Sequence, residues 1–364
     1  MTSDEEVPVQ DLDEAEEVIP FTFSITSYGA DYPVDSLVKR IDREDIIVPT
    51  FNWSDDESEV VGFQRSYVWP RSKADRFIES LLLGLPVPGI FLVKETSGRL
   101  LVLDGHQRLY TLASFYKGII AGSEYRLGNV QERFQDKTYE ELDVEDRRRI
   151  DDAIIHATIV RQDEPSEDQS SVYIVFERLN TGGVNLQPQE VRVALYHGEF
   201  AHALQKLNMN KDWRALYGKV SRRLKDLELI LRFFAFLYAS ESYKAPMKDF
   251  LNRYMAHNRH LAEQDEETLE LDFSRVVALL RSAVGPHAFR PRRAVNAAVV
   301  DSLMTGVAHR LAQGDVEDEA AFKEAFEGLM GNAEYMAAIE TGTSQEANVA
   351  TRLRLAREAF ANVK

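Results

Sequence analysis

The sequence predicts an α+β protein, with a mixed α/β N-terminal half and an all-helical C-terminal half. Two observations carry this prediction. Short apolar, β-branched segments alternate with helical periodicity up to about residue 200. Beyond that point the apolar residues follow almost only helical spacing. We expect an acidic disordered tail over residues 1–20, a mixed domain over 21–200 and a helical domain over 201–364, with no Gly/Ser-rich linker between the last two.

The elements of the first half follow from local signals. A β-branched strand is expected at 46–51 and a helix from Pro70 to Gly84, since proline suits a first helical turn and glycine a helix end. The apolar runs 90–93 and 100–103 flank Ser97-Gly98, which predicts a hairpin. A helix then ends near Gly118.

Further elements are predicted toward the middle of the chain. A helix is expected at 143–155, a strand at 157–161 and a helix at 172–179. Pro188 opens another helix, and the spacing of apolar residues at 227–237 gives one helix a wide apolar face.

Composition narrows the class of function. The chain has 364 residues, of which 44% are hydrophobic, so it can bury a sizeable core. It contains no cysteine, which excludes disulfides, thiolate zinc sites and a cysteine nucleophile. We find neither a secretory signal nor an apolar segment long enough to span a membrane, so a cytoplasmic protein is expected.

Charge is distributed unevenly. The net charge of −17 argues against a nucleic-acid surface that covers the whole molecule. Residues 1–18 carry eight acids and no base, whereas basic clusters occur at 147–149, 222–225 and 290–293. These clusters can be solvated helix faces or local DNA contacts, and the acidic tail can be a solvating segment or a DNA mimic that occupies a basic groove of its own chain.

The first candidate site lies where a strand passes into a helix. Gly105 permits a sharp turn after Asp104, and the unpaired N–H groups of the following helix favour an anion. Arg108 lies in the first turn, where a cation is unfavourable unless an anion or a carboxylate pairs with it. His106 and Gln107 add hydrogen-bonding groups. The alternative is an ordinary Asp-Gly turn with a surface arginine.

A second candidate site precedes a glycine-rich break. Arg178 lies one turn before the glycines of this break, whose N–H groups can form a nest that includes Gly182, with Arg178, Asn180 and Thr181 facing a phosphate. The same residues also suit a plain helix C-terminus, because asparagine and glycine tolerate left-handed backbone angles. Just beyond, Glu190 can complete the site with Arg192 or form an ordinary surface pair with it.

A third segment combines polar and aromatic residues. Gln64 and Arg65 are set among aromatic side chains that include Tyr67 and Trp69. These rings can stack on a base or can cover the protein core, and the second role is the commoner one.

Together and in this order, the motifs resemble the N-terminal domain of GmrSD-type restriction endonucleases. The resemblance covers about residues 40–255 and includes Arg223–Arg232 and Met247–Asn252. It is carried mainly by the runs Gln64–Trp69, Ile78–Pro88, Asp104–Leu112, Arg178–Leu186 and Glu190–Arg192.

The resemblance implies a ParB-like fold related to sulfiredoxin. It also implies nucleoside triphosphate binding and hydrolysis at an Asp-Gly-Gln-Gln-Arg motif in a restriction or anti-phage system. Here His106 replaces the first glutamine of that motif, which leaves the nucleotide preference open. The HNH nuclease motif of full-length relatives is not found, since His257, Asn258 and His260 lie in a helical pattern and are interpreted as surface residues.

Three functions are considered on this basis. The first is a nucleoside triphosphatase whose catalytic residues are Asp104, His106, Gln107 and Arg108, with Asp104 positioning Mg²⁺ or water. The expected nucleotide-binding residues are Gln64, Arg65, Gly105, Arg178, Asn180, Thr181 and Gly182. The second is a non-hydrolysing module that responds to nucleotide or DNA and regulates a partner nuclease. The third, DNA cleavage by this chain, is ranked last because no dense carboxylate cluster is apparent.

Overall fold

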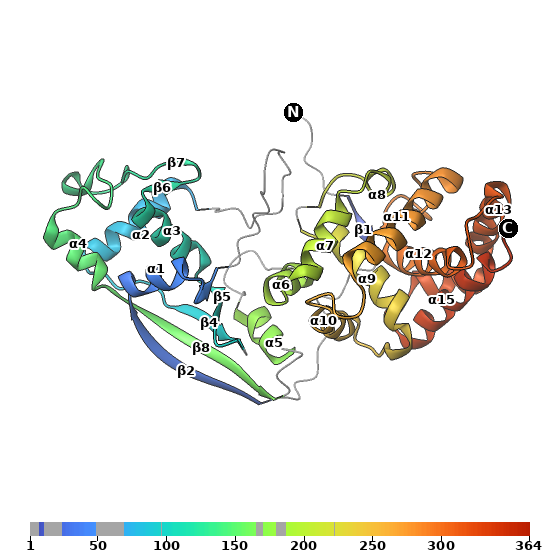
Figure 1. Cartoon of the computed structure of the whole chain (residues 1–364), viewed down its shortest axis with the longest axis horizontal. Coiled ribbons are helices and arrows are strands. Elements are labelled where there is room, and N and C mark those ends of the chain that lie inside the picture. Colours follow the sequence, from blue (N-terminus) through green and yellow to red (C-terminus); the bar gives the residue numbers. More distant parts are fainter. Residues whose placement is uncertain are drawn as a thin grey trace. The chain divides into compact units, whose positions relative to one another are not determined.

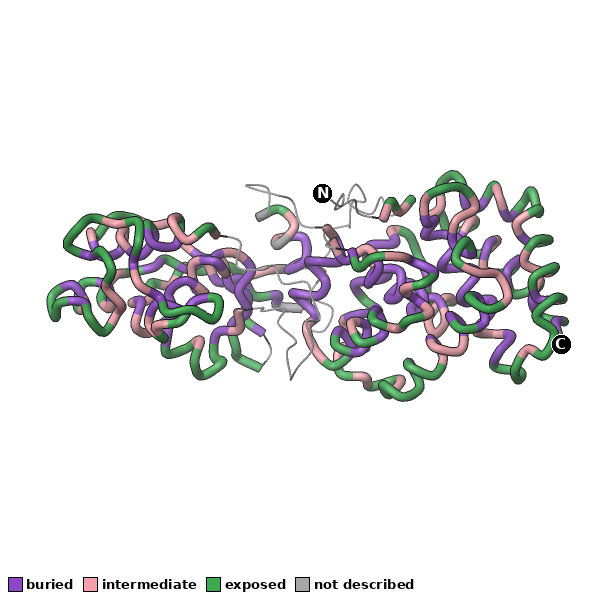
Figure 2. Tube along the Cα trace, turned by 90° about the horizontal axis from the view of Figure 1, so that it is seen from above, coloured by how far each residue is buried: buried purple, intermediate pink, exposed green. Residues whose placement is uncertain are grey.

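The structure is a computed structural model, shown in Figure 1. It describes residues 7–10, 24–48, 69–95, 97–164, 170–179, 187–221 and 223–364. The chain divides into two compact units, one formed by Thr22–Val184 and the other by Met1–Phe21 with Asn185–Lys364. In each unit the buried residues run through the interior (Figure 2).

The first unit is built on a five-stranded mixed sheet with the strand order β2-β8-β4-β5-β3. β2 pairs antiparallel with β8, β4 runs parallel to β8 and antiparallel to β5, and β3 runs parallel to β5. The strands are β2 (Ser24–Pro33), β3 (Ile46–Ile47), β4 (Ile90–Lys94), β5 (Leu100–Asp104) and β8 (Ile154–Glu164). A separate short hairpin joins β6 (Ile119–Ile120) to β7 (Ser123–Glu124).

Four helices share one core with alternate residues of this sheet. They are α1 (Val34–Asp42), α2 (Arg71–Leu82), α3 (His106–Lys117) and α4 (Val144–Asp151), with the 3₁₀ turn η2 (Glu132–Phe134) between the last two. Ile90, Leu92 and Val102 contribute from the strands, as period-two alternation requires. The helix α5 (Ser170–Leu179) packs on β8 and β2. This arrangement leaves the end of β5 and the start of α3 at one edge of the core.

Several predictions for this unit are confirmed, and one is wrong in part. Pro70 is the N-terminal cap residue of α2, and the hairpin of β4 and β5 turns at Ser97-Gly98 as expected. The helix expected at 143–155 ends at Asp151, and β8 begins at Ile154. Pairing of Ile154 and Ile155 with β2 replaces the expected last helical turn.

The second unit is almost entirely helical in the part of the chain described, which agrees with the predicted α+β class. None of the described helices combines the length and apolar character needed to cross a membrane. The helices are α6 (Pro188–Leu195), α7 (Glu199–Asn208), α8 (Lys211–Tyr217), α9 (Lys225–Ala239), α10 (Met247–His257), α11 (Glu266–Leu279), α12 (Ala297–Leu311), α13 (Glu319–Gly331), α14 (Ala333–Glu340) and α15 (Glu346–Phe360), with the 3₁₀ turn η4 (Ser240–Ser242) and the π-helical turn η5 (Leu280–Val284).

Of the expected disordered tail over 1–20, only residues 7–10 are described, and the tail itself stays a prediction. Within these residues β1 (Val9–Gln10) pairs in parallel with β9 (Val295–Asn296) of the helical unit. The two compact units divide between Val184 and Asn185, upstream of the boundary expected near 200. α6 belongs to the helical unit for a physical reason, since its residues are buried against α9 and α10.

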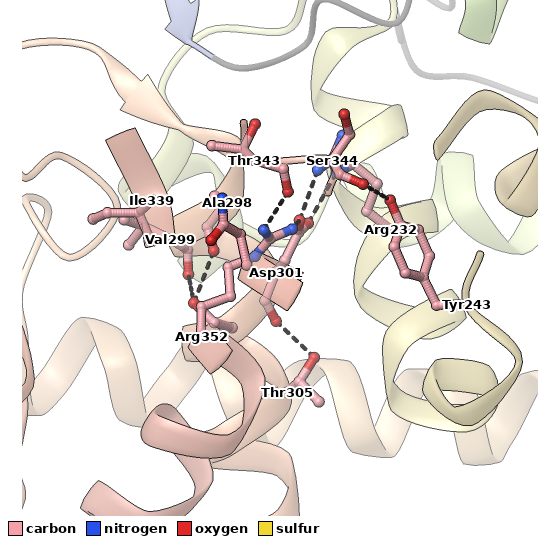
Figure 3. Close-up of polar contacts among 12 residues, drawn as sticks. Arg232, Tyr243, Ala298, Val299, Asp301, Thr305, Ile339, Thr343, Ser344 and Arg352 are labelled. Carbon is pink, nitrogen blue, oxygen red and sulfur yellow. Dashed lines mark hydrogen bonds and ion pairs between the residues drawn. The ribbon is translucent and has the colours of Figure 1, made fainter. Parts of the chain in front are cut away.

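A buried ion cluster fixes three helices of this unit to one another (Figure 3). Arg232 of α9 donates to both carboxylate oxygens of Asp301 on α12, with distances of 2.9 Å to Oδ1 and 2.7 Å to Oδ2. Arg352 of α15 donates to the same Oδ2 at 3.1 Å. All three side chains are at least 98% buried, so the cluster specifies which helix faces can meet.

Candidate functional site

The turn between β5 and α3 requires a glycine. Gly105 is the N-terminal cap residue of α3 and has φ +99°, in the left-handed region. A Cβ at this position would lie 2.4 Å from Ile90 Cγ2, and Ile90 is buried in the core. Both the backbone angle and the lack of space therefore exclude a side chain at Gly105, and the residue itself is buried.

Arg108 is held over this turn by two acceptors. Its Nη2 donates to Asp104 Oδ2 at 2.7 Å and to the Gly89 carbonyl at 2.9 Å. The Arg108 side chain is 14% exposed and that of Asp104 is 47% exposed. The carboxylate thus supplies the partner that a cation in a first helical turn needs. Arg108 Nε is buried without a hydrogen-bond partner in the described part of the chain, which leaves one donor of the guanidinium unused.

Gln107 and His106 form the other side of the motif. Gln107 is 91% buried, and its Oε1 accepts the backbone N–H of Trp69 at 3.4 Å. Its Nε2 lies 2.8 Å from His106 Nε2. Trp69 is the last residue of the aromatic segment that begins at Gln64. The hydrogen bond from Trp69 to Gln107 therefore connects the described end of that segment with the turn at Gly105.

Trp69 itself is engaged with α2. Its ring makes an edge-on contact with Phe77 at 5.6 Å between centroids, and Lys73 Nζ lies 4.8 Å from the ring centroid. This packing favours the core-covering role for Trp69. Gln64, Arg65 and Tyr67 lie outside the described residues.

The second predicted site is described only in part. Arg178 is exposed near the end of α5, whereas Asn180, Thr181 and Gly182 lie outside the described residues. Arg178 makes no ion pair with Asp104 in the part of the chain that the structure describes. Whether this segment joins the turn at Gly105 therefore stays a prediction.

Glu190 and Arg192 do not form the surface pair considered above. Glu190 Oε2 accepts the Gln187 N–H at 2.6 Å in a capping box and pairs with Arg223 at 3.1 Å. Arg192 is fully buried and donates through Nε to Asn252 Oδ1 at 2.8 Å. Both residues therefore belong to the interior of the helical unit.

One titratable pair near the turn was not foreseen. His156 Nδ1 lies 2.5 Å from Asp31 Oδ1, because the register of β2 and β8 places the two residues opposite each other. They are 125 positions apart, so no spacing in the sequence points to them. Ile155 and Ala157 belong to the core shared with α3, and strand alternation therefore turns His156 to the opposite face of the sheet.

His257 and His260 agree with their interpretation as surface residues. The interpretation is wrong for Asn258, which is only 4% exposed and donates through Nδ2 to the Tyr254 carbonyl at 3.0 Å. His257 pairs with Glu263 and His260 with Glu199, and both imidazoles are mostly exposed. Among the described residues no group of three or more His, Asp or Glu side chains could hold a metal ion. A single carboxylate, Asp104, remains as the expected metal ligand.

The comparison with protein families agrees with the resemblance drawn from the motifs. Residues 36–197 match the model of the GmrSD restriction endonuclease N-terminal domain, and the match contains the turn at Gly105, Arg178 and Arg192. No curated protein and no solved structure matches the chain, so the relation to ParB and sulfiredoxin stays a prediction. Residues 36–197 belong to the family of GmrSD restriction endonuclease N-terminal domains.

Proposed function

We propose that this chain is the nucleoside triphosphate-hydrolysing component of a restriction or anti-phage system that acts on foreign or modified DNA. The observation that carries the proposal is the turn from Asp104 through Gly105 to Arg108. There a glycine without space for a Cβ lies at a helix N-terminus, beside a largely buried arginine with an unused donor.

The turn suits a phosphate chain for electrostatic reasons. The first N–H groups of α3 have no acceptor within the helix, and the helix dipole favours negative charge at this end. A phosphate oxygen that approached Gly105 could accept from these groups. Arg108 would then neutralise charge that develops on the transferred phosphoryl group, while Asp104 would position Mg²⁺ or the attacking water.

The residues present fit Mg²⁺ only if the nucleotide supplies further ligands. Mg²⁺ commonly takes one or two carboxylates, with phosphate oxygens and waters completing its shell. Asp104 is nearly half exposed, and only its Oδ2 is engaged by Arg108, so Oδ1 remains to face an ion. A bound Mg²⁺ would offset phosphate charge, and Asp104 would hold it at the strand end.

The test is phosphate release from a panel of nucleoside triphosphates with Mg²⁺, with and without DNA. Wild type is compared with Asp104→Asn and Arg108→Ala, and Arg148→Ala serves as a control because Arg148 is an exposed arginine elsewhere in the same unit. Release that the first two substitutions abolish and the control retains supports the proposal. Equal release by Arg108→Ala and wild type would contradict it.

The non-hydrolysing alternative has a distinct signature in the same experiment. If folded wild type binds nucleotide without releasing phosphate, and Arg108→Ala binds it more weakly, the turn is a ligand switch for a partner nuclease. The ion pair between Arg108 and Asp104 gives this alternative a physical basis, since a bound phosphate would compete with Asp104 for the guanidinium.

A further inference from the structure

A cavity of about 490 Å³ lies within the helical unit. Small-molecule sites in proteins commonly have volumes of about 300–1,000 Å³, so this space is large enough for a ligand. Its lining comes from β1, from the segment that leads into β9 and from α14. The lining includes Gln10, Pro291, Arg292, Met336, Ile339 and Glu340.

Hydrogen bonds tie the walls of the cavity to one another. Val295 of β9 donates its N–H to the Pro8 carbonyl at 3.1 Å, which holds β1 against β9. Asn296, also on β9, is 4% exposed and donates through Nδ2 to the Ile339 carbonyl of α14 at 3.0 Å. The three stretches of chain are therefore fixed to one another, and the cavity that they line is preformed.

An ion pair belongs to the cavity wall. Arg292 Nη2 donates to Glu340 Oε1 at 2.7 Å, and the two side chains are 71% and 42% exposed. This contact uses one amino group of the guanidinium and one oxygen of the carboxylate. Neither side chain makes another hydrogen bond to the described part of the chain. Arg292 therefore keeps donors, and Glu340 keeps an acceptor, for a ligand.

The ion pair narrows the class of ligand. Because its two charges largely cancel, the pair offers hydrogen bonds and little net field to a free phosphate or ammonium ion. A ligand that leaves the ion pair intact must carry an acceptor and a donor side by side on one edge. Pro291, Met336 and Ile339 give the same cavity an apolar lining, which suits the faces of a flat ring.

Guanine has such an edge, because its O6 acceptor adjoins the N1–H and N2–H₂ donors. Arginine is the commonest specific partner of guanine O6, and carboxylates accept from the amino groups of bases. We propose that this cavity binds guanine, with Arg292 donating to O6 and Glu340 accepting from N1–H and N2–H₂. The cavity lies outside residues 36–197 and in the other unit from the turn at Gly105, so this site goes beyond the proposed function.

The test is isothermal titration of folded wild type with guanosine, inosine and adenosine. We expect guanosine to bind roughly tenfold or more tightly than adenosine, since matched contacts to a base edge discriminate by at least about that factor. Inosine lacks the N2 amino group and should bind with an affinity between the two. Failure of guanosine to bind, or equal affinity for adenosine, would overturn the proposal.

Four substitutions locate the binding. Glu340→Gln and Arg292→Ala should each weaken guanosine binding roughly tenfold. Glu334→Gln is the control for the first, because Glu334 is an exposed acid of the same helix that pairs with Arg354. Arg293→Ala is the control for the second, because Arg293 is exposed and does not line the cavity. An affinity for guanosine that survives both cavity substitutions would also overturn the proposal.

Two sources of guanine share this chemistry, a free guanine nucleoside or nucleotide and an unpaired guanine in single-stranded DNA. An oligothymidylate that carries one guanine is therefore titrated beside guanosine, with plain oligothymidylate as the blank. If the guanine-containing strand binds more tightly than guanosine and Glu340→Gln removes the difference, the source is DNA. If guanosine alone binds, the source is the free nucleoside or nucleotide, and both results support a guanine site. Guanosine carries no phosphate, so this titration and phosphate release at the turn can fail independently.

Discussion

Arg108 Nη2 lies 2.7 Å from Asp104 Oδ2 across a single turn of backbone. The carboxylate belongs to the last residue of β5, and the guanidinium belongs to the first turn of α3. The ion pair therefore links the end of the strand to the start of the helix. Because the arginine is 86% buried and the aspartate nearly half exposed, removing the carboxylate frees a cation at the turn, whereas removing the arginine leaves a solvated acid.

We expect Arg108→Ala to lower the rate of phosphate release by about 100-fold or more, since one charge-stabilising donor is typically worth that much in a phosphoryl-transfer site. Arg108→Lys should restore charge but only part of the rate, because lysine lacks the additional N–H donors of the guanidinium, among them the unused Nε, that a phosphate could accept from. Steady-state release measures both. Similar rates for the alanine and lysine variants would show that charge at this position is not what matters.

Gly105→Ala should destabilise the first unit through two separable costs. The backbone angle φ +99° costs about 1–3 kcal/mol for a side-chain-bearing residue, and contact with Ile90 Cγ2 adds overpacking of about 1–3 kcal/mol. Gly98→Ala is the matched control, because Gly98 has φ +86° and nothing within 4 Å of an added Cβ. Urea unfolding gives both values, and equal losses for the two variants would show that Ile90 yields without cost.

The elements that could be predicted from the sequence share one property: the apolar residues within each of them recur at a regular spacing. The β4–β5 hairpin buries most of its residues and α2 buries half of its own, so the apolar positions of both are regularly spaced. β2 was not predicted because it is an edge strand whose residues are largely exposed, with Gly29 and Asp31 among them. Its pairing with β8 depends on a partner about 125 positions away, which local patterns cannot indicate.

The candidate site was predictable where it is local. Asp104, Gly105 and Arg108 lie within five consecutive residues, and the strand-to-helix junction at this motif was expected from helix and turn chemistry alone. The Gly89 carbonyl that holds Arg108 was not predictable, since it comes from the start of a neighbouring antiparallel strand. Long-range register, and not residue type, decides such contacts.

Asp301→Ala should be among the most destabilising substitutions in the helical unit. It would leave Arg232 and Arg352 buried together without a counter-charge, and breaking a buried ion cluster in this way costs about 3–5 kcal/mol. Asp315→Ala is the control, because Asp315 pairs with Arg275 while 86% exposed, and loss of such a pair costs at most about 1 kcal/mol. Thermal unfolding compares the two, and similar shifts in Tm would contradict a special role for Asp301.

Two tyrosines of the first unit should make its stability depend on alkaline pH. Tyr116 donates to Asp151 Oδ1 at 2.6 Å and Tyr139 donates to the same oxygen at 2.9 Å. Burial, with the hydrogen bond to Asp151, raises the pKa of Tyr139 to about 12 and that of Tyr116 further. A tyrosine pKa that is raised on folding stabilises the protein fully below the unfolded value of about 10, and this stabilisation is lost as pH rises through the folded value.

Tyr116→Phe should therefore unfold more easily than wild type at neutral pH, by about 1–3 kcal/mol for a buried hydrogen bond to a carboxylate. The difference should shrink above about pH 10, because ionisation of Tyr116 in the unfolded chain then favours the unfolding of wild type and not that of the phenylalanine variant. Urea midpoints across this range, with phenolate absorbance recorded in parallel, measure the effect. Tyr28→Phe is the control because Tyr28 is 42% exposed. A difference between Tyr116→Phe and wild type that stayed constant to about pH 12 would mean that the shared carboxylate does not set the ionisation of Tyr116.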